Sequence, residues 1–580
     1  MTRTVAVVPH THWDREWYEP FAAYRARLVE MLSQLLDRME AEPGLRHVHL
    51  DGQMALVDDY LEMRPEDEGR LRALVAAGRL SVGPWYVLMD EFLVSAETIV
   101  RNLQLGLARA AGLGGSPPVG YLPDMFGHVG QMPQILRLAG LVHAVVWRGV
   151  PAAVDRSAFW WRAPDGSTVR AEYLPYGYSN GASIPDDPAA FLRRLHAHEA
   201  QMAPYLAPDA PLLLMNGTDH QAPQPWLPAV VDATNAEQKD FELSVTSLSD
   251  YLAAAPSEAL PSWTGELRSG ARANLLMGVA SNHVDVKVDA AVAERLLERR
   301  AEPLAALWLP EADWPDRLLE RAWLQLIRNS AHDSICACSA DEVVLAVRAR
   351  YAEATAVARE VVASVRRRAS AAFAAPGVVV LNPNPWPMAG LVEVTVPGDP
   401  PPGAQVLAAT EAGVEERHGR GRDLGRLVAE LSEDGWLDDL RGTESAVRAT
   451  PDGLELDVLL DRAAPPDPWL RGIDTVMAEA TAHAGADPDG PLRVRVERRR
   501  ASRVLARVGA VPGYGWTRFD AGAAADDPPV RAGANWLDNG ALRLAVSPAD
   551  GSFSIDGLAG LDRLVDGGDA GDTYNYSPPE

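Results

Sequence analysis

The chain has 580 residues, of which 47% are hydrophobic and 23% are charged, and its formal net charge is −26. This length exceeds what one hydrophobic core organises, so about two to four domains are expected. The charge argues against nucleic acid or an anionic membrane as a partner, and no apolar run approaches the roughly 20 residues of a membrane span. Two neighbouring cysteines, Cys336 and Cys338, are too close for an easy disulfide. With no signal-peptide pattern at the N-terminus, they favour a cytoplasmic location.

Short apolar runs alternate with helical patterns up to about residue 272. The run 4–8 is rich in β-branched residues and predicts a buried strand that Pro9 ends. Further strands are predicted at 47–50, 80–83, 119–122, 144–147 and 212–215. Strands that alternate with helices form mostly parallel sheets or barrels. Residues 1–272 are therefore predicted to form an irregular β/α barrel that carries the catalytic site.

Two other textures follow. Residues 273–375 show helical patterns at 286–308, 315–332 and 339–373, which predict a three-helix bundle. Residues 376–580 show alternating apolar runs and many Pro and Gly turns, which predict a β-sandwich. No pattern of a closing strand follows residues 574–579, so this sandwich is expected to be incomplete, to expose apolar surface and to self-associate. The expected fold class is a multidomain protein of α/β, α and β parts.

Polar and aromatic residues follow the first predicted strand. An extended continuation places His10, His12 and Asp14 on one face. An imidazole and a carboxylate then meet one metal ion at the carboxyl end of the strand, where open α/β sheets bind their ligands. A bare His-x-Asp pair is more often a polar loop. The segment 14–18 adds charge and aromatic rings, as sugar-binding sites do, and favours the functional interpretation.

Three more polar clusters are predicted near the same rim. Asp124 follows the strand at 119–122, Asp219 follows the strand at 212–215, and His332 with Asp333 ends the second bundle helix. Each cluster alone has an ordinary interpretation, as a turn, a helix cap or a partner of the helix dipole. Their recurrence on one rim favours a shared site of titratable groups.

These stretches together resemble the glycoside hydrolase family 38 α-mannosidases, and most of all the bacterial branch that includes mannosylglycerate hydrolases. The resemblance is carried by residues 10–18, 51–53, 83–86, 94–103, 120–131, 147–149, 216–221 and 332–344. Members of the family are usually longer, so the chain resembles a C-terminally short version.

The resemblance implies one Zn²⁺ per chain, held by His12, Asp14, Asp124 and His332. It also implies that Asp124 is the nucleophile and Asp219 the general acid/base of a retaining, exo-acting α-mannosidase that forms a glycosyl-aspartate intermediate. Two imidazoles and two carboxylates suit Zn²⁺. The implied substrate contacts are Trp17, Phe126, Arg148, Asp333 and Tyr574.

Other functions stay open. A mannosylglycerate hydrolase would use the same chemistry on a different aglycone. A metal-dependent carbohydrate de-N-acetylase would activate water without forming a covalent sugar, and a non-catalytic carbohydrate-binding protein would need neither Asp124 nor Asp219. Cys336 and Cys338 are expected to be buried thiols behind the site rather than metal ligands.

Overall fold

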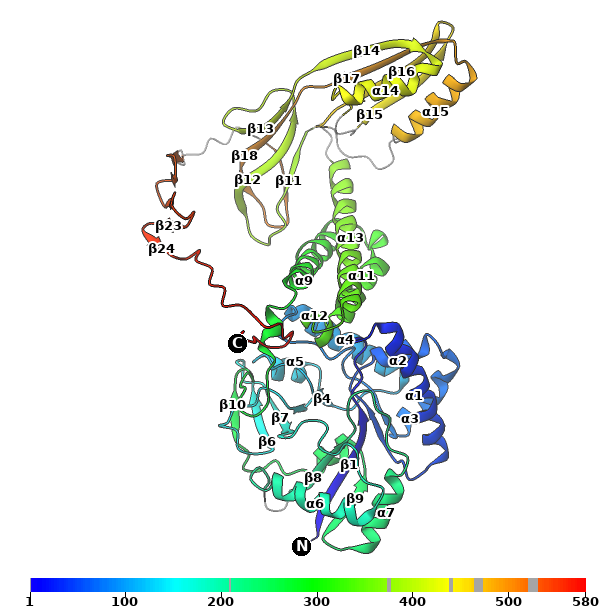
Figure 1. Cartoon of the computed structure of the whole chain (residues 1–580), viewed down its shortest axis with the longest axis vertical. Coiled ribbons are helices and arrows are strands. Elements are labelled where there is room, and N and C mark those ends of the chain that lie inside the picture. Colours follow the sequence, from blue (N-terminus) through cyan, green and yellow to red (C-terminus); the bar gives the residue numbers. More distant parts are fainter. Residues whose placement is uncertain are drawn as a thin grey trace. The chain divides into compact units, whose positions relative to one another are not determined.

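A computed structural model describes residues 2–207, 210–372, 377–437, 442–463, 473–519 and 530–579 (Figure 1). The chain forms two units, one of residues 1–366 with 566–580 and one of residues 367–565. The boundary expected between residues 375 and 376, and the terminal Glu580, lie outside the described residues. Among the described residues, no helix combines the length and apolar character needed to cross a membrane.

The first unit contains two five-stranded sheets of mostly parallel strands. In the first, β3 (Leu80–Ser81), β2 (Val48–Leu50), β1 (Arg3–Thr11) and β8 (Leu212–Asn216) lie in that order, and β9 (Phe241–Val245) also pairs with β1. The second has the order β10 (Ser262–Thr264), β6 (Ala158–Arg162), β7 (Thr168–Tyr173), β5 (His143–Val146) and β4 (Val119–Leu122). Of these pairs, β6–β7 is antiparallel.

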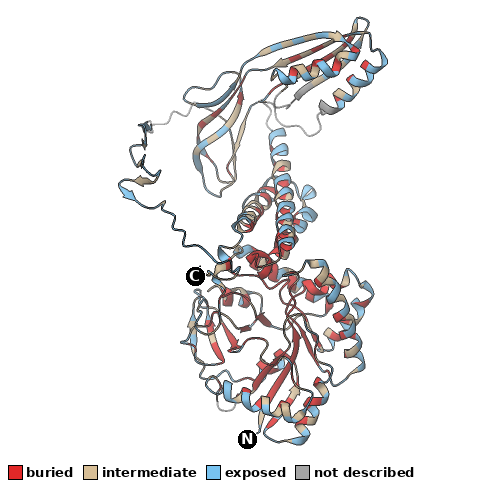
Figure 2. Ribbon diagram, viewed as in Figure 1, coloured by how far each residue is buried: buried red, intermediate tan, exposed pale blue. Residues whose placement is uncertain are grey.

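The two sheets share a buried interior. One hydrophobic cluster combines Val8 of β1 and Met215 of β8 from the first sheet with Tyr121 of β4 and Val145 of β5 from the second. Figure 2 shows the strands of both sheets as largely buried. The strands of a parallel sheet that is covered on both faces are short, nearly continuous apolar runs in the sequence. This is why they could be located there. The expected multidomain class with α/β parts is confirmed.

The first strand continues through Pro9, where the sequence predicted an end. β9 pairs with Arg3–Val7 of β1 and β2 pairs with His10 and Thr11. Pro9 falls between these two partners, where a missing backbone N–H costs no ladder bond. The strand therefore extends far enough to present His12 at its end.

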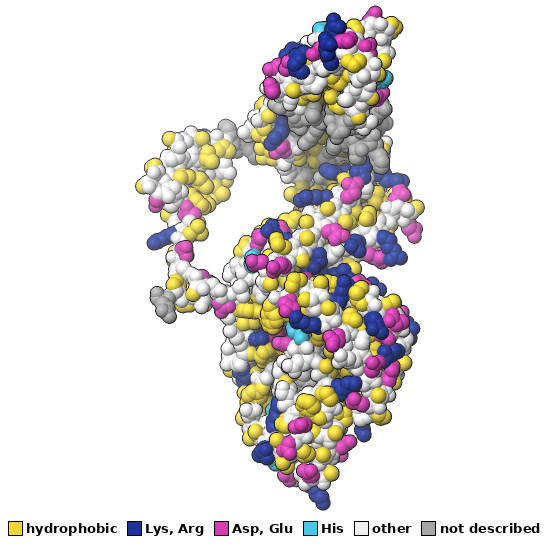
Figure 3. Space-filling model, turned by 45° about the vertical axis from the view of Figure 1, so that its right-hand side comes forward, with side chains coloured by type: hydrophobic (Ala, Val, Ile, Leu, Met, Phe, Trp, Pro, Cys, Tyr) yellow, Lys and Arg dark blue, Asp and Glu magenta, His cyan; other side chains and the backbone are white. Residues whose placement is uncertain are grey.

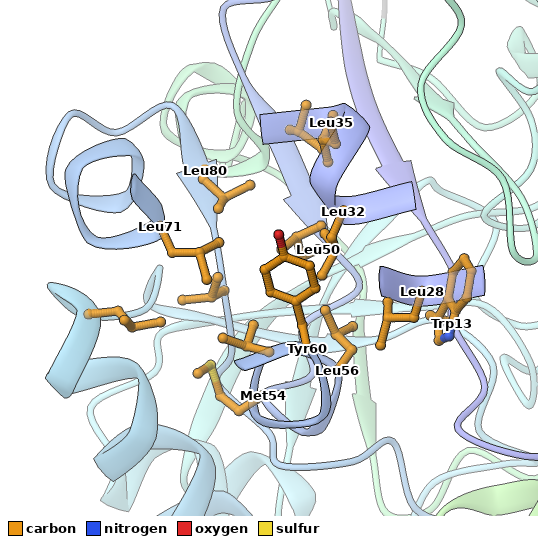
Figure 4. Packing of buried hydrophobic residues seen from close by; sticks show 14 of the residues in the cluster. Trp13, Leu28, Leu32, Leu35, Leu50, Met54, Leu56, Tyr60, Leu71 and Leu80 are labelled. Carbon is orange, nitrogen blue, oxygen red and sulfur yellow. The ribbon is translucent and has the colours of Figure 1, made fainter. Parts of the chain in front are cut away.

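Helices with apolar stripes cover the first sheet. In α1 (Phe21–Ala41) the buried leucines 28, 32, 35 and 36 recur at helical spacing. They pack with α2 (Ala55–Leu61), α3 (Glu68–Ala76) and the strands β2 and β3, around the buried ring of Tyr60 (Figure 4). The Tyr60 hydroxyl donates to Asp67 Oδ2 at 2.5 Å, so its polar end is also satisfied. This packing fixes the strand β2, whose end leads into the site.

The remaining helices of the barrel region connect its strands. They are α4 (Ala96–Leu113), α5 (Met132–Leu138), α6 (Pro188–Met202), α7 (Leu227–Glu237) and α8 (Leu248–Ala254). Short 3₁₀ turns lie at Pro65–Asp67 and Met277–Ala280.

Most of residues 284–371 is helical, with breaks at 309–310, 314–315, 330–331 and 337–340. The first predicted helix consists of α9 (Val284–Leu296), a π-helical turn η3 (Leu297–Ala301) and α10 (Glu302–Trp308). Pro303 stands just after the π turn, where the missing N–H and the ring of a proline disturb a regular helix. The other helices are α11 (Asp316–Asn329), α12 (His332–Cys336) and the long α13 (Asp341–Ala371), with a 3₁₀ turn at Glu311–Asp313. The short α12 begins with a candidate site residue.

The second unit is built from several antiparallel and mixed sheets. β12 (Met388–Pro397), β18 (Ala501–Val511) and β13 (Gln405–Thr410) form one, and β11 (Val379–Leu381) pairs with β19 (Trp516–Arg518). β14 (Gly413–Arg420), β17 (Pro491–Arg498), β16 (Gly453–Leu460) and β15 (Gly442–Thr450) form another. A fourth contains β20 (Arg531–Ala532), β21 (Trp536–Asp538), β22 (Arg543–Val546), β23 (Phe553–Ile555) and β24 (Leu558–Ala559).

Here the structure differs from the expected β-sandwich. Helices α14 (Leu424–Glu433) and α15 (Ile473–Ala486), rather than a second sheet, cover the four-stranded sheet. Leu427 and Leu431 of α14 and Ala480 of α15 pack on Leu456 and Val494 of the strands. The alternating burial of β16 and β17 needs an apolar cover, and the leucines at helical spacing in α14 supply it as well as a sheet does.

The sheet of β20–β24 exposes apolar side chains (Figure 3). Leu542 is 56% exposed, Leu558 is 66% exposed and Leu564, just beyond the sheet, is 95% exposed. Exposed apolar groups that lie close together mark association surfaces.

We expect the 580-residue chain to self-associate through this surface, and the double change Leu558→Lys with Leu564→Lys to shift it toward monomer. Sedimentation velocity over a concentration series measures this. Leu138→Lys, at an isolated leucine that is 82% exposed in the other unit, is the control and should leave association unchanged. A wild-type chain that stays monomeric throughout contradicts the prediction.

Candidate active site

The ends of β1 and β8 lie side by side and present His12 and Asp219. The His12 N–H donates to the Thr218 carbonyl at 3.3 Å, and the His220 N–H donates to the His12 carbonyl at 2.8 Å. His12 and Asp219 form an isolated parallel bridge beyond the strands. Because the carboxyl ends of parallel strands meet at one edge, both side chains face the same rim.

The four residues predicted to hold a metal ion converge at this rim. His12 Nε2 lies 3.2 Å from Asp14 Oδ1, and His332 Nε2 lies 3.4 Å from the same oxygen. Asp124 Oδ2 lies 4.0 Å from His12 Nε2 and 3.9 Å from His332 Nε2. The two imidazole rings stack with centroids 5.5 Å apart. His10, by contrast, does not join them, because its Nε2 contacts the Tyr178 carbonyl at 2.9 Å.

The donor set fits a zinc ion. His12 Nε2 is buried and makes no well-aligned hydrogen bond to a described residue, although Asp14 Oδ1 lies 3.2 Å away. A buried nitrogen without a partner is costly unless it coordinates something. Two imidazole nitrogens with carboxylate oxygens are the ligands that Zn²⁺ takes, with a position left open in catalytic sites.

A second layer of contacts aims both imidazoles. Asp51, directly after β2, lies 2.9 Å from His12 Nδ1, and it also accepts from the Trp13 N–H at 2.8 Å and from Gln53 Nε2 at 2.7 Å. His332 Nδ1 lies 3.1 Å from the Leu88 carbonyl. A hydrogen bond donated by Nδ1 leaves the Nε2 lone pair for the metal.

The residue that aims His12 is one that the sequence analysis did not assign. Asp51 has φ 49°, in the left-handed region, and Gly52 follows with φ 67°. The strain of this turn is tolerated because three donors hold the carboxylate. Its signal in the sequence is a carboxylate at the end of a predicted strand, which is the position that also pointed to Asp124 and Asp219.

The charges at this point call for a cation. Burial alone would lower the pKa of His12, yet the charges of Asp51 and Asp14 outweigh it and raise the pKa well above its usual value. Burial alone would raise the pKa of Asp14, but His12, His220 and His332 hold it well below its usual range. The carboxylates thus favour a positive charge between them, which a divalent ion supplies.

Asp124 stands on the loop after β4 and is oriented by charged and aromatic partners. Arg148 Nε donates to its Oδ1 at 2.8 Å, so Oδ2 is the oxygen that faces the two histidines. The loop is held from below by the buried Glu91, which contacts His128 Nδ1 at 2.7 Å and accepts from the Val129 N–H at 2.8 Å. The charge-assisted bonds of Arg148 and Glu91 together fix the position of the Asp124 carboxylate.

Tyr178 links the two carboxylates and was not found from the sequence. Its hydroxyl donates to Asp219 Oδ1 at 2.8 Å and lies 3.3 Å from Asp124 Oδ2. Burial, with the charges of Asp124 and Asp219, raises the pKa of Tyr178 far above its usual value. The hydroxyl therefore stays a proton donor to either carboxylate. No local pattern marks Tyr178, because it lies in a loop between two predicted elements.

The predicted substrate contacts line one cleft of ≈ 490 Å³ beside these groups. Trp17, Phe126, Arg148, Asp333 and Tyr574 all reach it. Tyr574 comes from the segment 566–579, which packs on the first unit, and its hydroxyl accepts from Trp17 Nε1 at 2.8 Å. Gly278 allows this approach, because a Cβ there would lie 2.7 Å from the Asn575 Cα.

Cys336 and Cys338 are buried free thiols, as predicted. Cys338 Sγ lies 3.2 Å from Asp333 Oδ1 and Cys336 Sγ lies 3.6 Å from Asp90 Oδ2. Among the described residues, neither thiol belongs to a group of side chains placed to hold a metal ion. They pack behind Asp333.

Comparison with known proteins identifies the family. Residues 2–266 match the family described as "Glycosyl hydrolases family 38 N-terminal domain", and residues 274–368 match "Alpha mannosidase middle domain". The chain belongs to glycoside hydrolase family 38. The matched residues hold all the candidate site residues except Tyr574.

Similar proteins of family 38 are longer than this chain. A "Putative mannosylglycerate hydrolase" of Halalkalibacterium halodurans is 35% identical over 63% of the chain and 42% of its own length. Human alpha-mannosidase 2C1 is 23% identical over 70% of the chain and 38% of its own length. The crystal structure of an alpha-mannosidase from Enterococcus faecalis V583 matches with a TM-score of 0.73 and 27% identity, over 96% of the chain and 60% of that protein. The chain thus spans about half the length of the relatives it matches.

We expect the double variant His12→Ala/His332→Ala to lose stoichiometric zinc, because it removes both nitrogen donors. Asp51→Asn should keep the fold but lower zinc affinity by roughly 10–100-fold, since the amide no longer fixes the His12 tautomer. Metal content by mass spectrometry and competition with a chelator of known affinity measure both effects.

Asp67→Asn is the matched control for the zinc measurement. Asp67 is also a buried carboxylate, but it accepts from Tyr60 in the α1–α3 cluster, and the asparagine oxygen can keep that bond. It should leave zinc affinity unchanged. Full zinc content in the double histidine variant, or wild-type affinity in Asp51→Asn, counts against the assignment.

Proposed function

We propose that the chain is a retaining, exo-acting α-mannosidase that hydrolyses terminal α-mannosides with the help of one Zn²⁺. The observation that carries this proposal is the hydroxyl of Tyr178 in contact with both Asp124 and Asp219. Two oxygens that contact one hydroxyl lie closer together than the separation of about 6.5–9.5 Å typical of inverting enzymes. The pair is therefore suited to double displacement through a covalent sugar.

In the first step Asp219 donates a proton to the glycosidic oxygen while Asp124 attacks the anomeric carbon. The bond from that carbon to the aglycone oxygen breaks, the aglycone leaves as an alcohol, and a glycosyl ester forms on Asp124. In the second step Asp219 takes a proton from water, which attacks the same carbon and releases Asp124. The product keeps the α configuration because the carbon is inverted twice.

The other side chains position these two carboxylates and the sugar. Arg148 and Tyr178 hold Asp124 from two sides, so that one of its oxygens meets the substrate at a fixed angle. His12, Asp14, Asp124 and His332 would hold the zinc ion, which as a Lewis acid supplies charge stabilisation and binding for sugar hydroxyls. Trp17 and Phe126 supply ring faces, and Asp333 and Tyr574 polar contacts, for the sugar.

The parts of the chain divide this work. Residues 1–272 are proposed as the catalytic domain, residues 273–375 supply His332, and residues 376–580 supply Tyr574. The proposed partner is an α-mannoside rather than nucleic acid or a membrane. Buried free thiols at Cys336 and Cys338 support a cytoplasmic location, where thiols stay reduced.

Two alternatives differ in specific ways. A mannosylglycerate hydrolase shares every catalytic role and differs in the aglycone alone, and the relative from H. halodurans carries that name. A de-N-acetylase would have no use for a second carboxylate at Asp219, tied by Tyr178 to a metal-ligating carboxylate. Release of acetate from an acetamido sugar, without release of mannose from any α-mannoside, would establish the de-N-acetylase instead.

Substitution of the two carboxylates should separate their roles. Asp124→Ala should abolish turnover of every substrate, because it removes the nucleophile and a zinc ligand. Asp219→Asn should spare aryl α-mannosides far more than alkyl α-mannosides, because only a poor leaving group needs protonation. Steady-state kinetics on both substrates and NMR of the first-formed anomer measure this. Equal losses on both substrates count against Asp219 as the acid, and a β-configured first product excludes the covalent route.

Tyr178→Phe tests the link between the carboxylates. Removing the hydroxyl should lower kcat by roughly 10²-fold, the usual effect of losing one donor aimed at developing charge. KM and zinc content should change little, because Tyr178 is not a ligand. Tyr176→Phe is the control, since the Tyr176 hydroxyl donates to the Gln201 carbonyl at the surface. An unchanged kcat in Tyr178→Phe would contradict the positioning role.

A further inference from the structure

The cleft carries more negative than positive charge. Asp14, Asp124, Asp219, Asp333 and Asp572 line it, and among the described lining residues Arg148 is the cation. Two nitrogens of Arg148 are engaged, Nε with Asp124 at 2.8 Å and Nη1 with the Asn274 carbonyl at 2.7 Å.

These carboxylates lie at different depths. The side chains of Asp14 and Asp124 are 6% and 13% exposed, and both belong to the metal and nucleophile region. Asp572 is exposed, and it is not part of either group that could hold a metal ion. In the proposed mechanism the reacting sugar lies against the less exposed Asp124. Asp572 lines the same cleft but is exposed, so we infer that it stands on the side toward which the aglycone extends.

The position of Asp572 is set by its own turn. Its Oδ1 accepts from the Tyr574 N–H at 2.8 Å, and the Tyr574 hydroxyl is tied to Trp17 Nε1. The surrounding segment 566–579 contains Asp566, Asp569 and Asp572 and no lysine or arginine. This wall of the cleft thus brings negative charge without a counter-ion of its own.

Resting on the proposed α-mannosidase activity, we propose that Asp572 is a specificity-determining residue that makes this cleft select α-mannosides with uncharged aglycones and reject those with a carboxylate, such as glycerate. Like charges brought together at a binding surface exclude the wrong partner, which is how many sites gain specificity. A carboxylate on the aglycone would meet Asp572 on that side. The Arg148 guanidinium is held by Asp124 and by the Asn274 carbonyl. The hydroxyl groups of a neutral aglycone meet no such repulsion and can donate to the Asp572 carboxylate.

The test compares two ligands that differ in one charge. The S-linked analogues of α-mannosylglycerate and α-mannosylglyceramide resist hydrolysis, and calorimetry measures their binding to the zinc-loaded wild-type chain. The neutral glyceramide should bind at least about tenfold more tightly at low salt, and the difference should shrink as salt screens the charges. Asp572→Asn should reduce the ratio to below about threefold, by improving glycerate binding rather than by weakening glyceramide binding.

Asp566→Asn is the matched control, because Asp566 caps a turn in the same segment through the Gly568 N–H and does not line the cleft. In both variants the asparagine oxygen can keep accepting the turn hydrogen bond. Glycerate binding as tight as glyceramide binding, binding of neither analogue, or an unchanged ratio in Asp572→Asn would overturn the inference. Release of mannose is measured in a separate experiment from ligand binding. If the zinc-loaded chain releases mannose from neither aryl α-mannosides nor the O-linked glyceramide, the proposed α-mannosidase function fails, whatever the binding ratio.

Discussion

The buried hydrogen bond between Asp51 and His12 is the contact on which the rest of the site depends. It joins the ends of two neighbouring strands, β2 and β1, and it decides which imidazole nitrogen faces the rim. Its precision comes from the packing beneath it, where Tyr60 and the leucines of α1 fix β2. A mutation that loosens this core would therefore shift Asp51, and through Asp51 it would change the orientation of the His12 imidazole.

The helical region that contains His332 is joined to the candidate metal site by backbone hydrogen bonds. The His332 N–H donates to the Leu88 carbonyl at 3.0 Å and the Asp90 N–H donates to the Ser330 carbonyl at 3.2 Å. This short antiparallel bridge between Met89 and Ala331 holds the start of α12 beside the rim where His12 lies. The metal site is thus a contact between sequence-distant parts, and an ion bound there would hold them together, since a ligand that binds only the native state stabilises it.

Much of this could be predicted from the sequence, for a physical reason. Strands buried on both faces are nearly continuous apolar runs, and the polar residue after each run falls on the shared rim, which located His12, Asp124 and Asp219. Other features depend on context that no window of sequence contains. Pro9 is tolerated inside β1 because two partner strands leave a gap there. The helices α14 and α15 could not be predicted, because the alternating apolar face of a sheet can be covered by helices as well as by strands. Tyr178 could not be predicted, because a loop residue belongs to no periodic pattern of apolar positions.

The carboxylates in and beside the cleft differ in burial, and the roles proposed for them differ accordingly. Asp51, Asp333 and Asp14 are the most buried, where an uncompensated negative charge is most costly, and Asp51 and Asp14 surround His12 and favour a cation. Asp124 is more exposed and is held by Arg148, which suits the nucleophile role that we propose for it. Asp219 lies at the strand end beside it, where a proton must arrive and leave through solvent. Asp572 is exposed, and there a charge costs little to keep and acts only on what approaches from outside. On the roles proposed here, one kind of side chain would serve metal binding, catalysis and selection, because the depth of burial changes what its charge does.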